Sequence, residues 1–446
     1  MSARPTTPRS VLGLVFLTVF IDLVGFSILF PLFPALLEHY VAREGAASLI
    51  GQFQAALVEL IGDREGADFA VVTLFGGVLG SLYSLLQFLS APFWGGLSDR
   101  VGRRRALTFT LFGTALGYVL WALSGDFIVL VLSRLLNGVM AGNIAIASAV
   151  VADVSEPERR TRNMAVIGIA VGLGFVLGPA LGALAYGAAP IPEAWLGDGA
   201  LALNPFSAAA GLALALASFN WLWAVLRFPE TLPEASRGAS SMRLLNPFAS
   251  LRRISNPGVS RTNVVYLLYQ TCFAAMEFTL VFLAAERFGF APRENAVMFV
   301  FIGLTIALVQ GGIVRRLSGR YDDRRIAFTG IALLVPGFAL VGASSSLGEL
   351  YLGLFLLATG SALAFPSLSA LVSRYAPDAD QGLALGSFRS MGSLSRALGP
   401  VLGGLIYWYA GSAAPYYAGA ALLLVPLGMA AELPPLPDSG DRAAEA

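Results

Sequence analysis

The stretch VLGLVFLTVFIDLVGFSILFPLFPALL occupies residues 11–37 and carries a single ionisable side chain, Asp22. An α-helix needs about 20 mostly apolar residues to cross the roughly 30 Å of hydrocarbon in a bilayer. The stretch is also longer than the apolar core of a cleavable signal peptide, which has about 7–15 residues. We therefore expect it to be retained as a first membrane-spanning helix.

The rest of the chain has the same character, since 56% of the 446 residues are hydrophobic and only 13% are charged. A water-soluble domain carries about a quarter charged residues. Eleven further segments are long and apolar enough to span: 70–94, 106–124, 127–152, 164–187, 206–228, 262–285, 295–317, 327–345, 349–373, 383–409 and 414–432. Their length excludes a transmembrane β-barrel, whose strands have about 10 alternating residues. Because a backbone in lipid must satisfy its own hydrogen bonds, we predict an all-α membrane protein with twelve helices.

The distribution of arginine predicts the orientation of these helices. A cytoplasmic N-terminus places 22 arginines on the cytoplasmic side and leaves four outside, Arg43, Arg64, Arg287 and Arg293. Basic residues gather in cytoplasmic loops of membrane proteins. We therefore expect both termini to be cytoplasmic.

The loops divide the chain into two halves of six helices each. Residues 1–228 form the first half, with a long outer loop at 38–69 that has the pattern of a short amphipathic helix, and residues 262–432 form the second. Residues 229–261 are polar, basic and rich in proline, and are predicted to be a cytoplasmic linker. Residues 433–446 form a cytoplasmic tail.

Several classes of function find no support in the sequence. A single histidine and a single cysteine exclude a histidine-cluster metal site and an internal disulfide. There is no nucleotide-binding loop, nucleophile motif or metal-ligand cluster. The net charge of +1 and the absence of a basic tract give no sign of nucleic acid. We expect neither an enzyme nor a cofactor.

The string GGLSDRVGRRRAL follows the second span at residues 95–107. Glycines at 95 and 96 would let helices approach closely, Asp99 would accept hydrogen bonds from a helix N-terminus, and the arginines would face the anionic leaflet. An arginine cluster alone also suits an ordinary cytoplasmic loop. The whole string, however, resembles the signature of the major facilitator superfamily between spans two and three. The resemblance assigns a cytoplasmic gate to Gly95, Asp99, Arg100, Gly102, Arg103 and Arg104.

The second half repeats this string in a degraded form, GGIVRRLSGRYDDRRIA, at residues 311–327. Arg315 stands where Asp99 would align. We therefore expect only the first copy to make the aspartate-mediated gate contact of that superfamily.

Two charged residues of the first half lie deep in predicted spans. Asp22 is expected to be functional, because an ionised carboxylate near the bilayer centre is costly. Its string DLVGFSILFPLFP (22–34) resembles span one of tetracycline-type proton antiporters, and Pro31 and Pro34 would bend the helix. Arg134, in LVLSRLLNGVMAG (130–142), is at a similar depth and could pair with Asp22. A purely structural bond of either residue remains the alternative.

The second half contributes Glu277, Arg389 and Arg396. Glu277 and Arg396 are each about 20 Å from the cytoplasmic end and could pair. If Asp22 is paired as well, one arginine is left over, which would suit an anionic substrate group. Arg389 either takes that role or extends to the headgroups.

Span five reads GIAVGLGFVLGPALGA at residues 168–183. Its small residues make one helix face smooth for close packing, with a proline as a kink. The string resembles the antiporter motif of superfamily exporters, although Ala183 replaces the last glycine. The residues concerned are Gly172, Gly174, Gly178, Pro179 and Gly182.

Further strings extend the resemblance over residues 10–430, among them LLQFLSAPFWGGLSD (85–99), MEFTLVFLAAERFGF (276–290) and GSFRSMGSLSRALGP (386–400). They are similar to the drug:proton antiporter family, in particular to tetracycline transporter-like proteins of vertebrates and bacteria. The resemblance implies proton-coupled export of organic anions or amphipathic drugs by alternating access.

On this interpretation Asp22, Arg134 and Glu277 serve proton coupling, and Arg396 and Arg389 attract the substrate. Other side chains expected in the cavity are Phe26, Gln87, Asn137, Asn143, Tyr266 and Gln270. Uptake of a sugar or metabolite, and flipping of a lipid or glycolipid, stay open as alternatives. The expected partners are the bilayer, a small molecule and protons. We expect a monomer in a bacterial plasma membrane.

Overall fold

The computed structural model describes residues 8–45, 47–48, 50–52, 55–56, 59, 67–188, 190–233, 256–317, 320–376 and 381–435. In these ranges the chain is helical apart from its loops and one isolated β-bridge between Ser124 and Leu201. The predicted linker lies mostly outside the described residues, because its positions 234–255 are not among them. Most of the predicted outer loop beyond residue 45 lies outside them too.

We use "N-terminal half" for the helices up to Arg227 and "C-terminal half" for those from Pro257. The N-terminal half contains α1 (Pro8–Ser27), the short η1 (Phe30–Leu32), α2 (Phe33–Glu44), α4 (Ala67–Val101), α5 (Arg103–Ala122), α6 (Phe127–Met140), α7 (Asn143–Val154), α8 (Pro157–Ala188), η2 (Glu193–Trp195) and α9 (Ser207–Arg227). The C-terminal half contains α11 (Pro257–Phe288), α12 (Pro292–Leu308), the π-helical η4 (Val309–Val314), α13 (Arg315–Leu317), α14 (Asp323–Ala343), α15 (Leu347–Tyr375), α16 (Gln381–Ala410) and α17 (Ala414–Ala431).

Ten segments of the described chain are long and apolar enough to cross a membrane. The protein is therefore an all-α membrane protein. The two predicted spans outside this set correspond to α5 and α16. Both are long helices within the bundle, but arginine, threonine, serine and glycine make them less apolar. The count of twelve spans requires α5 and α16 to cross as well.

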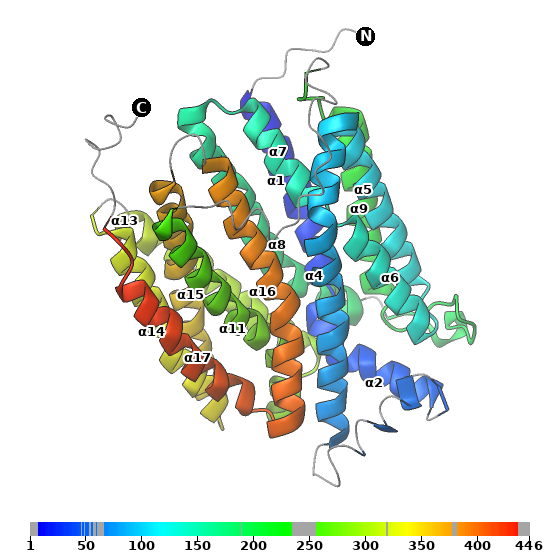
Figure 1. The fold of residues 1–446 in the computed structure, drawn as a ribbon. Coiled ribbons are helices and arrows are strands. Elements are labelled where there is room, and N and C mark those ends of the chain that lie inside the picture. Colours follow the sequence, from blue (N-terminus) through cyan, green and yellow to red (C-terminus); the bar gives the residue numbers. More distant parts are fainter. Residues whose placement is uncertain are drawn as a thin grey trace.

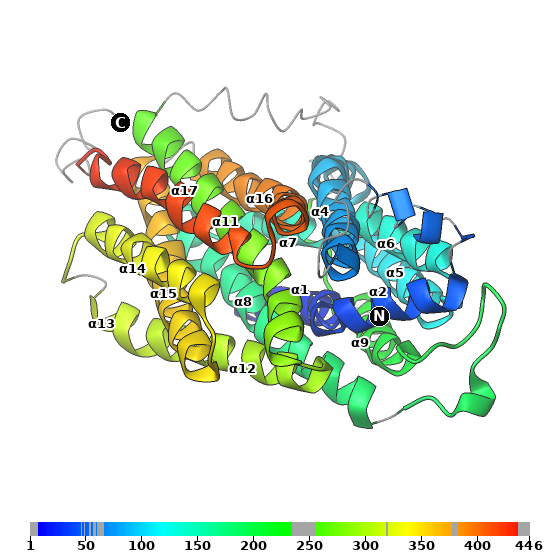
Figure 2. The ribbon, with the colours of Figure 1, turned by 90° about the horizontal axis from the view of Figure 1, so that it is seen from below.

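The two groups of helices lie side by side, as the view along the bundle shows (Figure 2). They meet where α4 packs against α16 and where α8 packs against α12. α1 begins and α17 ends at the same end of the bundle, which we call the terminal end; it is uppermost in Figure 1. The other end is called the opposite end below.

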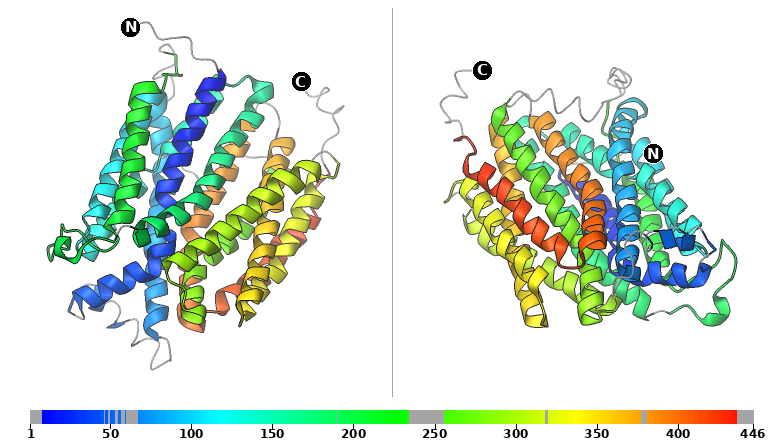
Figure 3. Two further views of the ribbon diagram at one scale, coloured as in Figure 1. Left: turned by 180° about the vertical axis from the view of Figure 1, so that it is seen from behind. Right: turned by 60° about the horizontal axis from the view of Figure 1, so that its bottom comes forward.

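The first span is bent, as the two prolines predict. Its helix α1 stops at Ser27, a single 3-10 turn follows, and α2 restarts at Phe33. Proline lacks a backbone N–H and clashes with the preceding turn, which interrupts an α-helix. Figure 3, left, shows α2 turned aside from the line of α1. At this bend the side chains of Leu29, Phe30 and Phe33 line the space between the halves.

The fourth span differs from the expected single helix at 127–152. It is divided into α6 and α7 by Ala141 and Gly142, close to the middle of the span. A β-carbon on Gly142 would lie 2.4 Å from Trp94 Cβ, so only glycine allows α4 to approach here. The indole N–H of Trp94 donates to the freed carbonyl of Val139 at 2.6 Å. The break gives the N-terminus of α7 a position inside the bundle.

The glycines of span five pack α8 against α1. A β-carbon on Gly174 would lie 2.5 Å from Leu23 Cβ, and one on Gly178 would lie 2.6 Å from the carbonyl oxygen of Val24. Gly172 differs from the predicted pattern, because a β-carbon there would meet nothing within 4 Å. The smooth face thus contacts a helix of its own half.

Substitution of Gly182 tests this packing. A β-carbon there would lie 2.2 Å from the backbone oxygen of Ile28, which cannot rotate away. We expect Gly182→Ala to destabilise the protein by about 1–3 kcal/mol, the usual range for overpacking, and to lower the thermal unfolding midpoint in detergent. Gly172→Ala is the matched control and should leave the midpoint unchanged. Equal midpoints for both variants would contradict the packing described.

Candidate functional site

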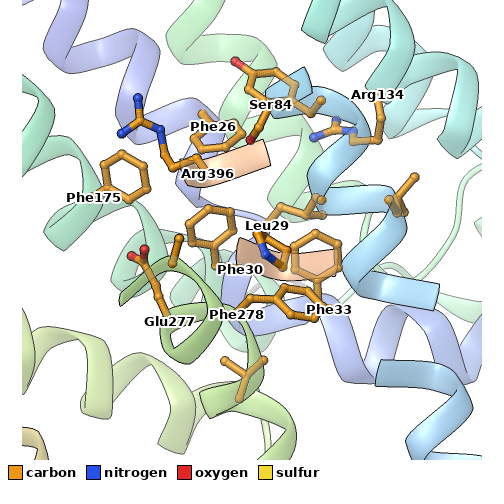
Figure 4. A pocket seen from close by; sticks show the side chains of 16 residues that line it. Phe26, Leu29, Phe30, Phe33, Ser84, Arg134, Phe175, Glu277, Phe278 and Arg396 are labelled. Carbon is orange, nitrogen blue, oxygen red and sulfur yellow. The ribbon is translucent and has the colours of Figure 1, made fainter. Parts of the chain in front are cut away.

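A cavity lies between the two halves, near the bend of the first span (Figure 4). The cavity is narrow in this conformation: its volume is about 50 Å³, below the roughly 300–1,000 Å³ of typical small-molecule sites. The wall residues are Phe26, Leu29, Phe30, Phe33, Leu79, Gly80, Tyr83, Ser84, Arg134 and Phe175 from the N-terminal half, and Ala274, Glu277, Phe278, Val281, Arg396 and Pro400 from the C-terminal half. Both halves therefore build one site.

Six of the sixteen residues that line this cavity are aromatic. Phe26 stacks on Tyr83 with ring centroids 4.4 Å apart, and Phe175 packs edge-on to Phe26 at 5.8 Å. Phe33 contacts Phe278 at 5.8 Å and so joins α2 to α11 across the halves. Such a wall suits a flat or amphipathic molecule, because aromatic rings bury large apolar areas and stack on one another.

Three charged side chains face this cavity: Arg134, Arg396 and Glu277. Arg134 extends from α6, Arg396 from α16 and Glu277 from α11 (Figure 4). When all three are ionised, the wall carries one net positive charge. An anionic group is therefore the complementary guest.

Arg134 is held by neutral groups. Its side chain is 3% exposed, and its guanidinium lies 5.0 Å from the ring centroid of Trp121 and 5.9 Å from that of Tyr118. Its Nη2 donates to Ser133 Oγ at 3.0 Å, while its Nε has no hydrogen-bond partner among the described residues. A buried cation with an unused donor is able to bind an added anion.

Asp22 does not pair with Arg134, contrary to the depth argument. Its Oδ1 accepts a hydrogen bond of 3.0 Å from Asn143 Nδ2, and Asn143 Oδ1 in turn accepts one of 2.5 Å from Thr110. Asn143 is the first residue of α7. The break in span four therefore places Asp22 at a helix N-terminus, whose partial positive charge favours a carboxylate. Equal depth on two helices says nothing about which way each side chain points.

Glu277 and Arg396 share the cavity, but the described chain contains no ion pair between them. Among the described residues, the guanidinium of Arg396 makes one weak hydrogen bond, 3.5 Å from its Nη2 to Ser393 Oγ. Figure 4 shows the two side chains on neighbouring stretches of the wall. Arg396 thus keeps donors free for a ligand.

Of the other expected cavity residues, only Phe26 is in the wall. Asn137 is buried beside Gly117, with both amide atoms unpaired among the described residues. Tyr266 is buried and stacks on Phe388 at 3.9 Å. Gln87, Gln270, Asn143 and Arg389 are not among the residues that line the cavity.

Four of the twelve wall residues that the sequence analysis missed are phenylalanines. Phe30 lies four residues after Phe26, and Phe33 lies three residues after Phe30. Phe278 is next to Glu277. The spacing of three or four residues places side chains on one helix face. Extending the helix faces of Glu277 and Arg396 by one turn would have found Ala274, Val281 and Pro400, whereas Phe30 and Phe33 lie beyond the end of α1.

The gate motif forms a network inside the N-terminal half. Arg103 is 6% exposed; its Nη1 pairs with Asp99 at 2.5 Å and its Nε with Asp153 at 2.9 Å. The expectation that this arginine faces the leaflet is wrong, because two carboxylates from α4 and α7 draw it inward. Arg100 is exposed.

The helix N-terminus that Asp99 was expected to cap is capped by Glu230. The carboxylate of Glu230 accepts from the backbone amides of Arg103 at 2.9 Å and Arg104 at 3.3 Å. Gly102 has φ +98°, and a β-carbon there would lie 2.3 Å from Glu230 Oε2. Glycine is therefore required both for the backbone angle and for the space of the carboxylate.

The first two glycines of the motif have a different environment from the one expected. A β-carbon on Gly95 or Gly96 would meet nothing within 4 Å. No helix in the described part of the chain uses these positions for a close approach, so that prediction is wrong for this conformation.

The second copy of the motif caps its own helix. Asp322 accepts from the amide of Arg324 at 3.0 Å and pairs with its guanidinium at 2.6 Å. Partial burial would raise the pKa of Asp322, but these bonds to Arg324 outweigh it and hold the pKa below its usual value. Asp323 pairs with Arg374 at 2.9 Å. The side chain of Arg315 is outside the described set.

Comparisons with known proteins agree with this architecture. The family described as Major Facilitator Superfamily matches residues 15–320 and 312–445. Major facilitator superfamily domain-containing protein 10 of Mus musculus is 36% identical over 447 residues, covering 95% of this chain and 92% of that protein. The class C tetracycline resistance protein of Escherichia coli is 27% identical over 413 residues, covering 92% and 93%.

A solved structure extends the similarity to the fold. The crystal structure described as "the human organic anion transporter MFSD10 (TETRAN)" superimposes with a TM-score of 0.75 and 36% identity, covering 96% of this chain and 100% of that one. The relatives at 36–38% identity come from mouse, cattle and human, so they give no support to the expected bacterial plasma membrane. The protein is a multi-pass integral membrane transporter, not an enzyme, and belongs to the major facilitator superfamily.

Proposed function

We propose that this transporter exports organic anions with an aromatic body in exchange for protons, by alternating access. One observation carries the proposal: the cavity between the halves combines five phenylalanine rings with two arginines and a single carboxylate. The similar human protein is described as an organic anion transporter. Tetracycline resistance proteins, to which the chain is also similar, favour export.

Arg134 and Arg396 would bind the anionic group of the substrate. Both guanidiniums have serine hydroxyls as hydrogen-bond partners and unused or weakly used donors. Charge-assisted hydrogen bonds from arginine to an anion are stronger than bonds to neutral acceptors. Glu277 would then limit the wall to one net positive charge, so that a monoanion is balanced.

Asp22 is the proposed proton carrier, with Glu277 as a second titratable group. Asp22 lies one turn before Phe26 on α1, and Phe26 is in the cavity wall. In the proposal, protonation weakens the bond from Asn143 and the attraction to the N-terminus of α7. α1 would then shift relative to α7 and carry Phe26 with it.

The proposed topology has twelve spans in the halves 1–228 and 262–432, with both termini in the cytoplasm and a monomer as the working unit. The arginine bias supports this orientation. The terminal end of the bundle, with the Arg103 network, would then be cytoplasmic.

Transport by the purified protein in liposomes tests the proposal. 2-Naphthalenesulfonate is an aromatic anion that stays charged at any working pH, and 2-naphthalenesulfonamide is a neutral analogue of similar shape. We expect the sulfonate to accumulate in liposomes with an acidic lumen, and the sulfonamide to behave as it does in protein-free liposomes.

Other outcomes separate the alternatives. Preference for a naphthyl trimethylammonium cation would overturn the anion assignment. Accumulation driven by external acid would indicate uptake, and movement that ignores the pH gradient would indicate facilitated diffusion. Transfer of a fluorescent lipid between leaflets without sulfonate transport would indicate a flippase.

A further inference from the structure

Arg389 takes neither of the two roles expected of it. It is not in the cavity wall, and its guanidinium crosses from α16 of the C-terminal half to the N-terminal half. One nitrogen, Nη1, donates to Ser148 Oγ on α7. The other, Nη2, donates to the carbonyl of Met164 on α8 at 3.1 Å. In Figure 1 the upper part of α16 lies beside α7 and α8.

This contact lies toward the terminal end. Arg389 is eight residues from the start of α16, or about 12 Å along the helix. Toward the opposite end, α4 and α16 meet backbone to backbone. A β-carbon on Gly77 would lie 2.5 Å from the oxygen of Pro400, and the amide of Val401 donates to Ser81 Oγ at 3.1 Å. The link through Arg389 depends on one long side chain.

Both hydrogen-bond partners of Arg389 are neutral. Arginine in a protein interior is usually paired with a carboxylate, and no ion pair of Arg389 is found within the described residues. A sulfonate or carboxylate would offer two charged oxygens to the same guanidinium and bind it more strongly than a hydroxyl and a carbonyl do. An anion is therefore able to displace Ser148 and Met164.

Arg389 lies on the same helix as a charged residue of the cavity wall, Arg396. Arg396 is seven residues further along α16, so the two residues share a helix face and their Cα atoms are about 10 Å apart along the axis. An anion released by Arg389 would find the next free cation at Arg396, in the cavity wall.

We propose that Arg389 is an anion-entry site that latches the halves together at the terminal end until an organic anion displaces its neutral partners. The inference rests on the proposed export of organic anions, and it names the residue that the substrate meets before the cavity. Arrival of the substrate and separation of α16 from α7 and α8 are then one event.

The test measures the separation of the halves directly. Cys272 is the single, buried cysteine, so a Cys272→Ser background allows spin labels at Arg105→Cys on α5 and Arg325→Cys on α14. Both positions are exposed at the terminal ends of their helices. Electron-electron double resonance of the full chain in lipid nanodiscs reports the distance distribution, with and without 2-naphthalenesulfonate.

In the parent protein we expect 2-naphthalenesulfonate, but not 2-naphthalenesulfonamide, to increase the long-distance population. Arg389→Gln should increase the ratio of the long-distance to the short-distance population about 30-fold without ligand, since it loses two hydrogen bonds of about 1 kcal/mol each, and should respond little to the sulfonate. Ser148→Ala should show a smaller increase and keep the response. Arg389→Lys should restore part of the closed state, and Arg316→Gln, an exposed arginine in α13, is the charge-matched control.

Parent-like distances in ligand-free Arg389→Gln would overturn the latch. An equal response to sulfonate and sulfonamide would overturn the entry site. A sulfonate-dependent opening without sulfonate transport would leave Arg389 as an anion site and count against the proposed export instead.

Discussion

Asp22→Asn is expected to abolish the accumulation of 2-naphthalenesulfonate that an acidic lumen drives. Asparagine has the size of aspartate and keeps an oxygen for the bond from Asn143, which in the protein is 3.0 Å long. It cannot take up or release a proton. The variant should therefore fold and bind substrate normally, while its pH-driven uptake falls to the level of protein-free liposomes.

An exchange assay and a control variant distinguish loss of proton coupling from loss of transport. Exchange of labelled for unlabelled sulfonate at equal pH requires no net proton movement and should persist in Asp22→Asn. Glu38→Gln removes an exposed carboxylate from α2 and is the matched control, with full coupling expected. If Asp22→Asn still accumulates sulfonate under the pH gradient, Asp22 is not the carrier, and Glu277, the carboxylate in the cavity wall, is the next residue to test.

Arg396→Gln is expected to raise the KM for 2-naphthalenesulfonate by about 10- to 100-fold. The physical reason is the loss of a hydrogen bond to a charged group, worth about 1.5–3 kcal/mol. The donors of Arg396 are committed only to a 3.5 Å contact with Ser393, so little else depends on them. Initial rates over a range of sulfonate concentrations provide the measurement.

The control for this variant is Arg293→Gln, an equal change of charge at an exposed position at the start of α12. It should transport with the parent KM. Arg396→Gln should also lose most of the preference for sulfonate over sulfonamide, because the guanidinium distinguishes them by charge. An unchanged KM together with an unchanged preference would show that the anion does not bind at Arg396.

The sequence was sufficient to predict the elements that depend on local chemistry. Hydrophobic length located the spans, and Pro31 and Pro34 predicted the bend between α1 and α2. The charged residues within predicted spans included Arg134, Glu277 and Arg396, which all face the cavity. A charge in an apolar span is conspicuous whatever the fold, because lipid cannot solvate it.

The sequence could not predict which way each span faces. Helices that are apolar on all sides give no periodic signal for the inner face. The partner of Asp22 therefore had to come from the structure, where the break at Ala141 and Gly142 brings Asn143 to it. The cap on α5 is similar, since Glu230 is more than a hundred residues from the amides that it accepts from.

For this protein, then, the sequence by itself determined that the chain spans the membrane many times, where the first span bends and which buried charges matter. Only the tertiary structure decided that Arg134 and Arg396 share one cavity, that Asp22 binds Asn143, and that Arg389 joins the two halves. The first set follows from the free energy of moving residues from water to lipid, which each segment determines alone. The second depends on contacts between distant segments, which exist only once the helices have packed.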